Sequence, residues 1–116
     1  MILKDITEAL KAEVVVNPAD INIQVQCGCS ADLMSDVLFY CTSNSILITG
    51  LTQRHVVRTA EIIGIKGIVF VQNKKPDKET IELAKEKKIP LFITPFCMYT
   101  ASGKLYEAGL RGCPKQ

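Results

Sequence analysis

The sequence predicts a single α/β domain with a mostly parallel sheet flanked by helices on both faces, which makes three layers. Apolar strands rich in β-branched residues alternate with helical segments along the chain. The strands expected over 46–49, 67–71 and 91–93 are apolar throughout, as strands buried on both faces are. The 116 residues, 47% of them hydrophobic, suffice for one such core over 1–116.

The first half of the chain contains the less regular elements. Apolar residues recur at helical intervals in 2–11, so a helix is expected there before a short strand over 14–16. Residues 21–27 alternate apolar and polar, which predicts a half-exposed strand at an edge of the sheet. A helix is expected over 32–40.

The second half repeats a strand and a helix three times. The helices are expected over 53–63, 77–87 and 97–108, each after one of the apolar strands. Gly64 and Gly109 stand where helix C-caps belong, and Pro76-Asp77 is typical of a helix start. The last residues, 111–116, are expected to form a loose tail.

The overall charge excludes some classes of partner. Fourteen basic and twelve acidic residues leave a net charge of +2, which gives no electrostatic case for binding nucleic acid.

No stretch approaches the roughly 18 apolar residues of a membrane span, and no secretory signal is visible, so we expect a cytoplasmic protein that does not bind membranes.

The five cysteines have two interpretations. They are Cys27, Cys29, Cys41, Cys97 and Cys113. In a cytoplasmic protein they are expected to be ordinary reduced thiols, and the Cys-x-Cys pair lacks the Cys-x-x-Cys spacing typical of metal and iron–sulfur sites. No metal or other cofactor is therefore expected. The alternative is a redox-active or metal-linked set that uses Cys27 and Cys29.

The turns between strands and helices indicate where a ligand would bind. In an open parallel sheet, ligands bind beyond the carboxyl ends of the strands, where helix N-termini offer free N–H groups. We expect a pocket with one polar wall from the turn before 32–40, a second from the turn after 46–49, and one more hydroxyl nearby. These residues are Ser30, Asp32 and Ser35, then Thr49, Gly50, Thr52 and Arg54, and finally Thr94.

Each residue type suggests a part in binding a small anion. Gly50 lets the backbone approach a ligand, while Thr52 and the helix N–H groups bind a phosphate or carboxylate that Arg54 neutralises. Ser30, Ser35 and Asp32 would select a polar or ribose-like group. The alternative is that the same residues are only helix caps and solvated side chains.

Several catalytic motifs are absent from the sequence. It contains no Gly-x-x-x-x-Gly-Lys phosphate loop, no Gly-x-Gly-x-x-Gly and no Gly-x-Ser-x-Gly. These absences argue against an NTPase, a dinucleotide enzyme of the usual kind and an α/β hydrolase. We expect no catalytic residues and no enzyme activity.

Three stretches together resemble the DRTGG domain family. They are residues 32–38 (DLMSDVL), 46–52 (ILITGLT) and 89–95 (IPLFITP), in the family's order and spacing. The resemblance covers 3–110, as a stand-alone domain. The Asp-Arg pair that gives the family its name should fall near 22–28, where this chain keeps only a glycine, Gly28.

The resemblance implies a regulatory or oligomer-forming α/β domain without established catalysis. Such domains are usually fused to CBS ligand-sensing pairs or to phosphotransacetylase and pyrophosphatase families, and the fold is similar to the N-terminal domain of HPr kinase/phosphorylase. Small relatives resemble accessory proteins encoded near iron hydrogenase components in anaerobic bacteria. That association gives the redox or metal-linked alternative its context and implies a protein partner.

We therefore expect a non-catalytic regulatory or ligand-sensing domain that binds a small anionic metabolite or nucleotide. A homodimer is also expected. The alternating segment 21–27 is typical of an unpaired edge, and Ile2 and Leu3 are expected to be exposed near the chain end.

Overall fold

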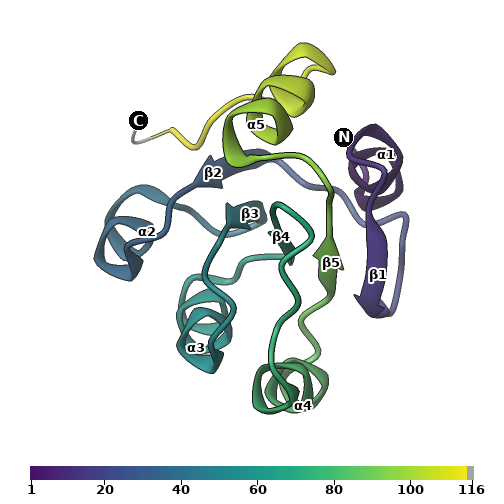
Figure 1. Ribbon diagram of the computed structural model, residues 1–116. Coiled ribbons are helices and arrows are strands. Elements are labelled where there is room, and N and C mark those ends of the chain that lie inside the picture. The colour runs from purple at the N-terminus through teal and green to yellow at the C-terminus, as the bar shows by residue number, and fades with distance from the viewer. Residues whose placement is uncertain (115–116) are drawn as a thin grey trace.

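The computed structural model describes residues 1–114 and has a five-stranded sheet between helices (Figure 1). This architecture confirms the predicted α/β class with helices on both faces. In chain order the elements are α1 (Leu3–Ala9), β1 (Glu13–Val16), β2 (Cys27–Ser30), α2 (Met34–Tyr40), β3 (Ser45–Thr49), α3 (Arg54–Ile63), β4 (Gly67–Phe70), α4 (Lys78–Lys87), β5 (Leu91–Ile93) and α5 (Met98–Glu107).

The sheet is parallel except at one edge. The strand order is β1-β5-β4-β3-β2, in which β2, β3, β4 and β5 are parallel and β1 pairs antiparallel with β5. Figure 1 shows α1 and α5 on one face of the sheet and α2, α3 and α4 on the other. The carboxyl ends of the four parallel strands therefore share one edge, where a site is expected.

Side chains of the central strands alternate between two apolar cores. Leu47 and Phe70 belong to the core under α2, α3 and α4, whereas Ile46, Val69 and Phe92 belong to the core under α1 and α5. All five are fully buried. Both faces of a central strand are thus apolar, which explains why these strands contain no polar alternation.

Two predicted helix ends are confirmed by their backbone. Gly64 ends α3 with φ +89°, and its N–H donates to the carbonyl of Ala60 at 2.9 Å. Few side chains tolerate that left-handed conformation, so glycine is favoured there. Asp77 begins α4, where its carboxylate accepts a hydrogen bond from the Thr80 amide at 2.8 Å.

The strand predicted over 21–27 was wrong, because the strand begins where that segment ends. The carbonyls of Ile21 and Ile23 instead accept the amides of Lys4 and Leu3 at 2.8 and 3.0 Å. These are donors in the first turn of α1 that have no partner inside the helix. The alternation arises because the apolar side chains of this segment pack against the core under α1.

The C-terminal tail was predicted to be loose, and for residues 111–113 this was wrong. Gly112 forms a parallel bridge with Gly28 of β2, and Cys113 is only 2% exposed. The Gly28 amide donates to the Arg111 carbonyl at 2.9 Å, and the Cys113 amide donates to the Gly28 carbonyl at 3.1 Å. The tail therefore satisfies backbone groups that the edge strand β2 would otherwise leave unpaired. Residues 115–116 lie outside the described part of the chain.

Candidate functional site

The carboxyl end of β3 is tied to the segment that follows β2. The Asp32 carboxylate accepts hydrogen bonds at Oδ1 from the Gly50 amide at 2.7 Å and from Thr49 Oγ1 at 3.1 Å. Asp32 precedes α2 rather than lying in its first turn, and neither Ser30 nor Asp32 caps that helix. Among residues 1–114 no group donates to Oδ2, so this oxygen remains available to a ligand hydroxyl.

A lysine that the sequence analysis missed also lies at this turn. A Cβ built on Gly50 would be 3.1 Å from Lys74 Nζ and 3.5 Å from Asp32 Oδ1. A side chain at position 50 would displace the Lys74 ammonium from this position. Within the described chain the two ion pairs within 4.0 Å, Arg54–Glu79 and Lys87–Glu61, do not involve Lys74. The sequence did indicate this position for Lys74, because the residue lies in the loop after the apolar strand β4, where the carboxyl ends of the parallel strands meet.

A cavity opens between β2 and α5. Ser30 and Ser102 lie at its rim with their hydroxyl oxygens 2.6 Å apart. Its volume is about 240 Å³, and Ile48 and Leu105 contribute apolar lining. Arg111, from the C-terminal segment, lies over the ring of Tyr106 with 4.7 Å between the guanidinium carbon and the ring centroid. The cavity thus combines apolar walls, two hydroxyls, an aromatic ring and a cation.

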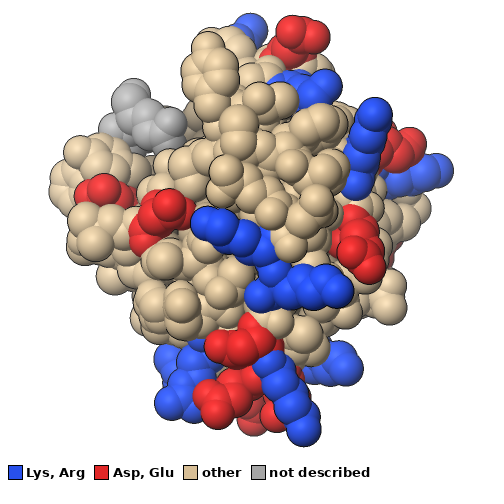
Figure 2. All heavy atoms as spheres, in the orientation of Figure 1, with Lys and Arg blue, Asp and Glu red and all other residues tan. Residues whose placement is uncertain are grey.

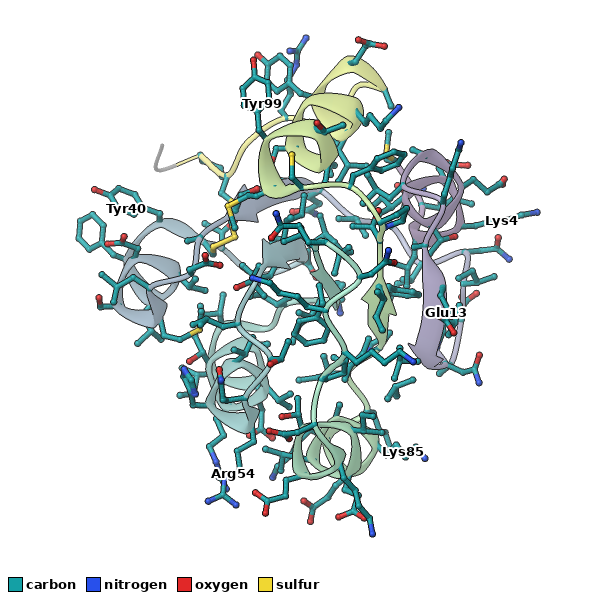
Figure 3. All side chains as sticks on the ribbon, viewed as in Figure 1. Lys4, Glu13, Tyr40, Arg54, Lys85 and Tyr99 are labelled. Atoms are coloured by element: carbon teal, nitrogen blue, oxygen red, sulfur yellow. A yellow bond between two sulfur atoms is a disulfide. The ribbon has the colours of Figure 1, made fainter. Side chains whose placement is uncertain are left out.

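A second cavity lies on the opposite side of β2 and is bounded by a disulfide. It has a volume of about 260 Å³, and Asp36 and Tyr40 contribute to its lining together with the Cys29–Cys41 disulfide. Figure 3 shows a sulfur–sulfur bond as a yellow stick between β2 and α2. The expectation of reduced thiols was wrong for these two residues. The strand and the end of the helix bring their Cα atoms to 6.0 Å, within the usual disulfide range.

The predicted pair of Cys27 and Cys29 is divided between two different partners. Cys29 bonds to Cys41, while Cys27 Sγ lies 2.9 Å from Cys113 Sγ. Across residues 1–114, no group of three or more His, Cys, Asp or Glu side chains is arranged to hold a metal ion. The thiol pair is therefore a feature separate from the predicted Cys-x-Cys motif.

Two of the predicted site residues are not brought to the turn at Gly50. Thr94 is fully buried, and its hydroxyl donates to the Leu10 carbonyl at 2.6 Å on the side of α1. Arg54 is exposed and pairs with Glu79 of α4 at 3.2 Å, and its side chain points away from the sheet in Figure 3. These two side chains are already used in structural contacts elsewhere.

Two more predicted residues lie in the segments that follow Gly50 and Asp32. Thr52 lies in the loop before α3, and its carbonyl accepts the hydroxyl of Thr80 at 2.8 Å, which ties this loop to α4. Ser35 is exposed at the start of α2. The structure therefore brings Asp32, Thr49 and Gly50 into direct contact, and the same edge adds Lys74.

The charged side chains visible in Figure 2 include both signs. On this face they gather over α3 and α4, which contribute the Arg54–Glu79 and Lys87–Glu61 ion pairs. A groove between the same helices is lined by both arginines and glutamates. Within the described residues, no helix is long and apolar enough to cross a membrane.

Comparison with known proteins supplies a family and a fold. The model of the DRTGG domain family matches residues 5–108. In fold, the chain is similar to the crystal structure of the CBS and DRTGG domains of the regulatory region of Clostridium perfringens pyrophosphatase, complexed with the activator diadenosine tetraphosphate. The TM-score is 0.76 with 22% identity over 89% of this chain, which spans 45% of that one. No curated protein matches the chain.

Proposed function

The chain belongs to the DRTGG domain family, and we propose that it is a non-catalytic regulatory domain. Its ligand would be a small anionic metabolite, with a nucleotide as the first candidate. The ligand would bind at the carboxyl ends of β2 and β3. The Clostridium regulatory region is complexed with a nucleotide activator, which supports a nucleotide as the first class to test.

The observation that carries the proposal is the arrangement of Lys74 and Asp32 around Gly50. The ammonium has no carboxylate partner within 4.0 Å among residues 1–114, and the glycine leaves the space beside it open. An anion placed there would gain the attraction of Lys74 and of the amides at the start of α3. The carboxylate of Asp32 repels a phosphate, so the phosphate is expected on the side of Lys74.

The other polar groups at this edge suit a hydroxylated ligand. Asp32 Oδ2 can accept a hydrogen bond from a ligand hydroxyl, and the exposed hydroxyl of Ser30 can donate or accept one. Beyond Ser30, the cavity of about 240 Å³ offers Tyr106 and apolar walls to a planar group. A nucleotide combines an anion, hydroxyls and a planar base, which matches these three features. Ser35 and Thr52 would contribute at the margin.

Calorimetry against AMP, ADP, ATP, diadenosine tetraphosphate and acetyl phosphate tests the proposal. At least one is expected to bind with a Kd below about 1 mM. Lys74→Ala should weaken that binding by about tenfold, which corresponds to about 1.4 kcal/mol. Lys75→Ala is the matched control, because it removes the same charge from the next residue of the same loop. Gly50→Val should also weaken binding by filling the space beside Lys74.

Two results would contradict this site. One is the absence of binding stronger than about 1 mM by every compound in the panel. The other is an equal loss of affinity in Lys74→Ala and Lys75→Ala, which would reveal a general charge effect. Arg54→Ala is expected to leave affinity unchanged, because that side chain is directed toward Glu79.

We also propose that the chain forms a homodimer, but through a different surface from the strand edge and helix start expected from the sequence. Leu3 is fully buried, and the tail partly covers the edge of β2, so neither supplies an exposed surface. Exposed apolar side chains instead gather on α2, where Leu38 is 48% and Phe39 is 64% exposed. Such a group is typical of an interface with a second copy or with a protein partner.

Sedimentation measures the oligomeric state directly. The wild-type chain should be a dimer at a few tens of micromolar, and Leu38→Glu should shift it to monomer because a charge on that face opposes its burial. Lys85→Glu, which changes an exposed residue of α4, is the control. A wild-type monomer at that concentration would remove the dimer from the proposal.

The proposal places the domain in the cytoplasm, where nucleotides are abundant.

A further inference from the structure

Two buried thiols face each other across the edge of the sheet. Cys27 Sγ in β2 and Cys113 Sγ in the tail are 2.9 Å apart, although 86 positions separate them in the sequence. The two residues are 4% and 2% exposed. A disulfide bond is about 2.05 Å long, so a shift of about 1 Å would bring the sulfur atoms to bonding distance.

The backbone holds the two cysteines in this position. The hydrogen bonds of Gly28 to Arg111 and Cys113 hold the tail alongside β2 through a single parallel bridge. A Cβ on Gly28 would be 3.3 Å from Leu110 Cδ2, so a glycine allows the close approach. Without a covalent link, the described tail is held by these bonds and by packing of Leu110 and Cys113.

The same segment forms one wall of the cavity between β2 and α5. Arg111 and Gly112 both line that cavity, and Arg111 lies over the ring of Tyr106. Release of the tail from β2 would remove this wall. Attachment of the tail would fix Arg111 beside Ser30 and Ser102.

We propose that Cys27 and Cys113 form a reversible disulfide that fastens the C-terminal segment to β2 and so fixes the Arg111 wall of the cavity. The oxidant is a small-molecule disulfide of the glutathione class. The thiolate of one cysteine attacks it, forms a mixed disulfide and releases one small thiol. The second cysteine then attacks the mixed disulfide and releases the other. Two protein S–H groups become one S–S bond, and both protons end on the two released thiols.

The surroundings of Cys27 determine how fast this exchange occurs. Burial and the neighbouring Cys113 raise the pKa of the Cys27 thiol to about 11, against an opposing contribution from the Thr42 hydroxyl at 3.2 Å. Thiolate is therefore scarce at neutral pH, and oxidation should be slow there and faster toward pH 9. Attachment of the tail does not depend on which ligand binds, so it can be tested independently of the proposed function.

The test uses the full chain carrying Cys29→Ser, Cys41→Ser and Cys97→Ser, which leaves Cys27 and Cys113 as its two cysteines. Trypsin cleaves after Lys11, Arg54, Arg111 and Lys115, so Cys27 lies in peptide 12–54 and Cys113 in 112–115. After equilibration with oxidised and reduced glutathione at several ratios, acid quenching and digestion, the two peptides are expected to be linked. Reduction should separate them.

The stability of the same protein provides a second measurement. Oxidation should raise its Tm by about 5 °C or more, because the bond closes a long loop in the unfolded chain. The control with Cys113→Ser added should show neither the linked peptide nor the rise in Tm. The wild-type chain should yield the same link beside the Cys29–Cys41 bond.

Three outcomes would overturn the inference. The first is that no linked peptide forms at any glutathione ratio, and the second is that only mixed disulfides with glutathione form. The third is one zinc or iron per wild-type chain that is lost on Cys27→Ser, which would make the pair part of a metal site. A failure of nucleotide binding with an intact Cys27–Cys113 link would contradict the proposed function alone.

Discussion

Two hydroxyl hydrogen bonds of equal length, one near each edge of the sheet, differ in their surroundings. At the β1 edge, Thr94 donates to the Leu10 carbonyl at 2.6 Å, and the threonine is fully buried. At the β2 edge, the hydroxyls of Ser30 and Ser102 are also 2.6 Å apart, but they are exposed at the rim of a cavity. Water can replace the second bond and cannot replace the first. The hydroxyl at the β1 edge is therefore structural, while the two at the β2 edge are accessible to solvent.

The largest effect is expected from removing the buried hydroxyl. Thr94→Val keeps the shape of the side chain but leaves the Leu10 carbonyl without its donor, which should cost about 1–3 kcal/mol of unfolding free energy. Ser102→Ala at the other edge should cost less than about 0.5 kcal/mol, because water takes the place of the hydroxyl. Urea unfolding followed by circular dichroism measures both. Equal losses would break the distinction between the two edges.

A second effect is expected at alkaline pH, at the β2 edge. The folded state raises the pKa of Cys27 from 9.0 to about 11, mainly through burial. An unfolded chain then ionises this thiol first, so the stability that it contributes is complete below pH 9.0 and is lost as pH rises through about 11.

The measurement is the urea midpoint of the reduced protein across this pH range. The midpoint should fall less steeply in Cys27→Ser than in the wild-type chain. Cys97→Ser should retain the wild-type slope. If Cys27→Ser and the wild-type chain have identical slopes, the thiol does not stabilise the β2 edge in its neutral form.

The smallest effect is a difference in reactivity that leaves the fold intact. Cys97 is exposed at the start of α5, where its thiol donates to the Thr100 hydroxyl at 3.4 Å. Hydrogen bonding with the side chain and the backbone of Thr100 lowers the pKa of this thiol. Iodoacetamide at neutral pH should therefore alkylate Cys97 at least about ten times faster than Cys27. Peptide mass spectrometry after timed quenching compares the two. Faster labelling of Cys27 would indicate that the tail is detached from β2.

The fold was predictable from sequence where local pattern and tertiary environment agree. Apolar strands such as β3 and β4 must be buried on both faces, so a short run of apolar residues is enough to predict them. The segment 21–27 failed because its alternation reflects packing under α1, where its carbonyls serve the helix amides. A one-dimensional pattern shows which side chains are buried, but it does not show which backbone groups pair.

The candidate site was predictable in its place but only partly in its residues. Because parallel strands place their carboxyl ends at the same end of the sheet, the sequence correctly predicted that Asp32, Thr49 and Gly50 lie together. It could not show that Thr94 points toward Leu10, or that Arg54 pairs with Glu79 on the next helix. Those outcomes depend on side-chain direction and on a neighbouring helix, neither of which the spacing of residues determines.

The central claim is that an anionic ligand binds at the carboxyl ends of β2 and β3 and does not contact β1. Amide chemical shifts of the ¹⁵N-labelled chain, titrated with the tightest nucleotide from calorimetry, test it directly. The largest changes are predicted at Asp32, Gly50 and Lys74, with none in Glu13–Val16, and Lys74→Ala should reduce them. Largest changes in β1, or in the groove between α3 and α4, would contradict the account.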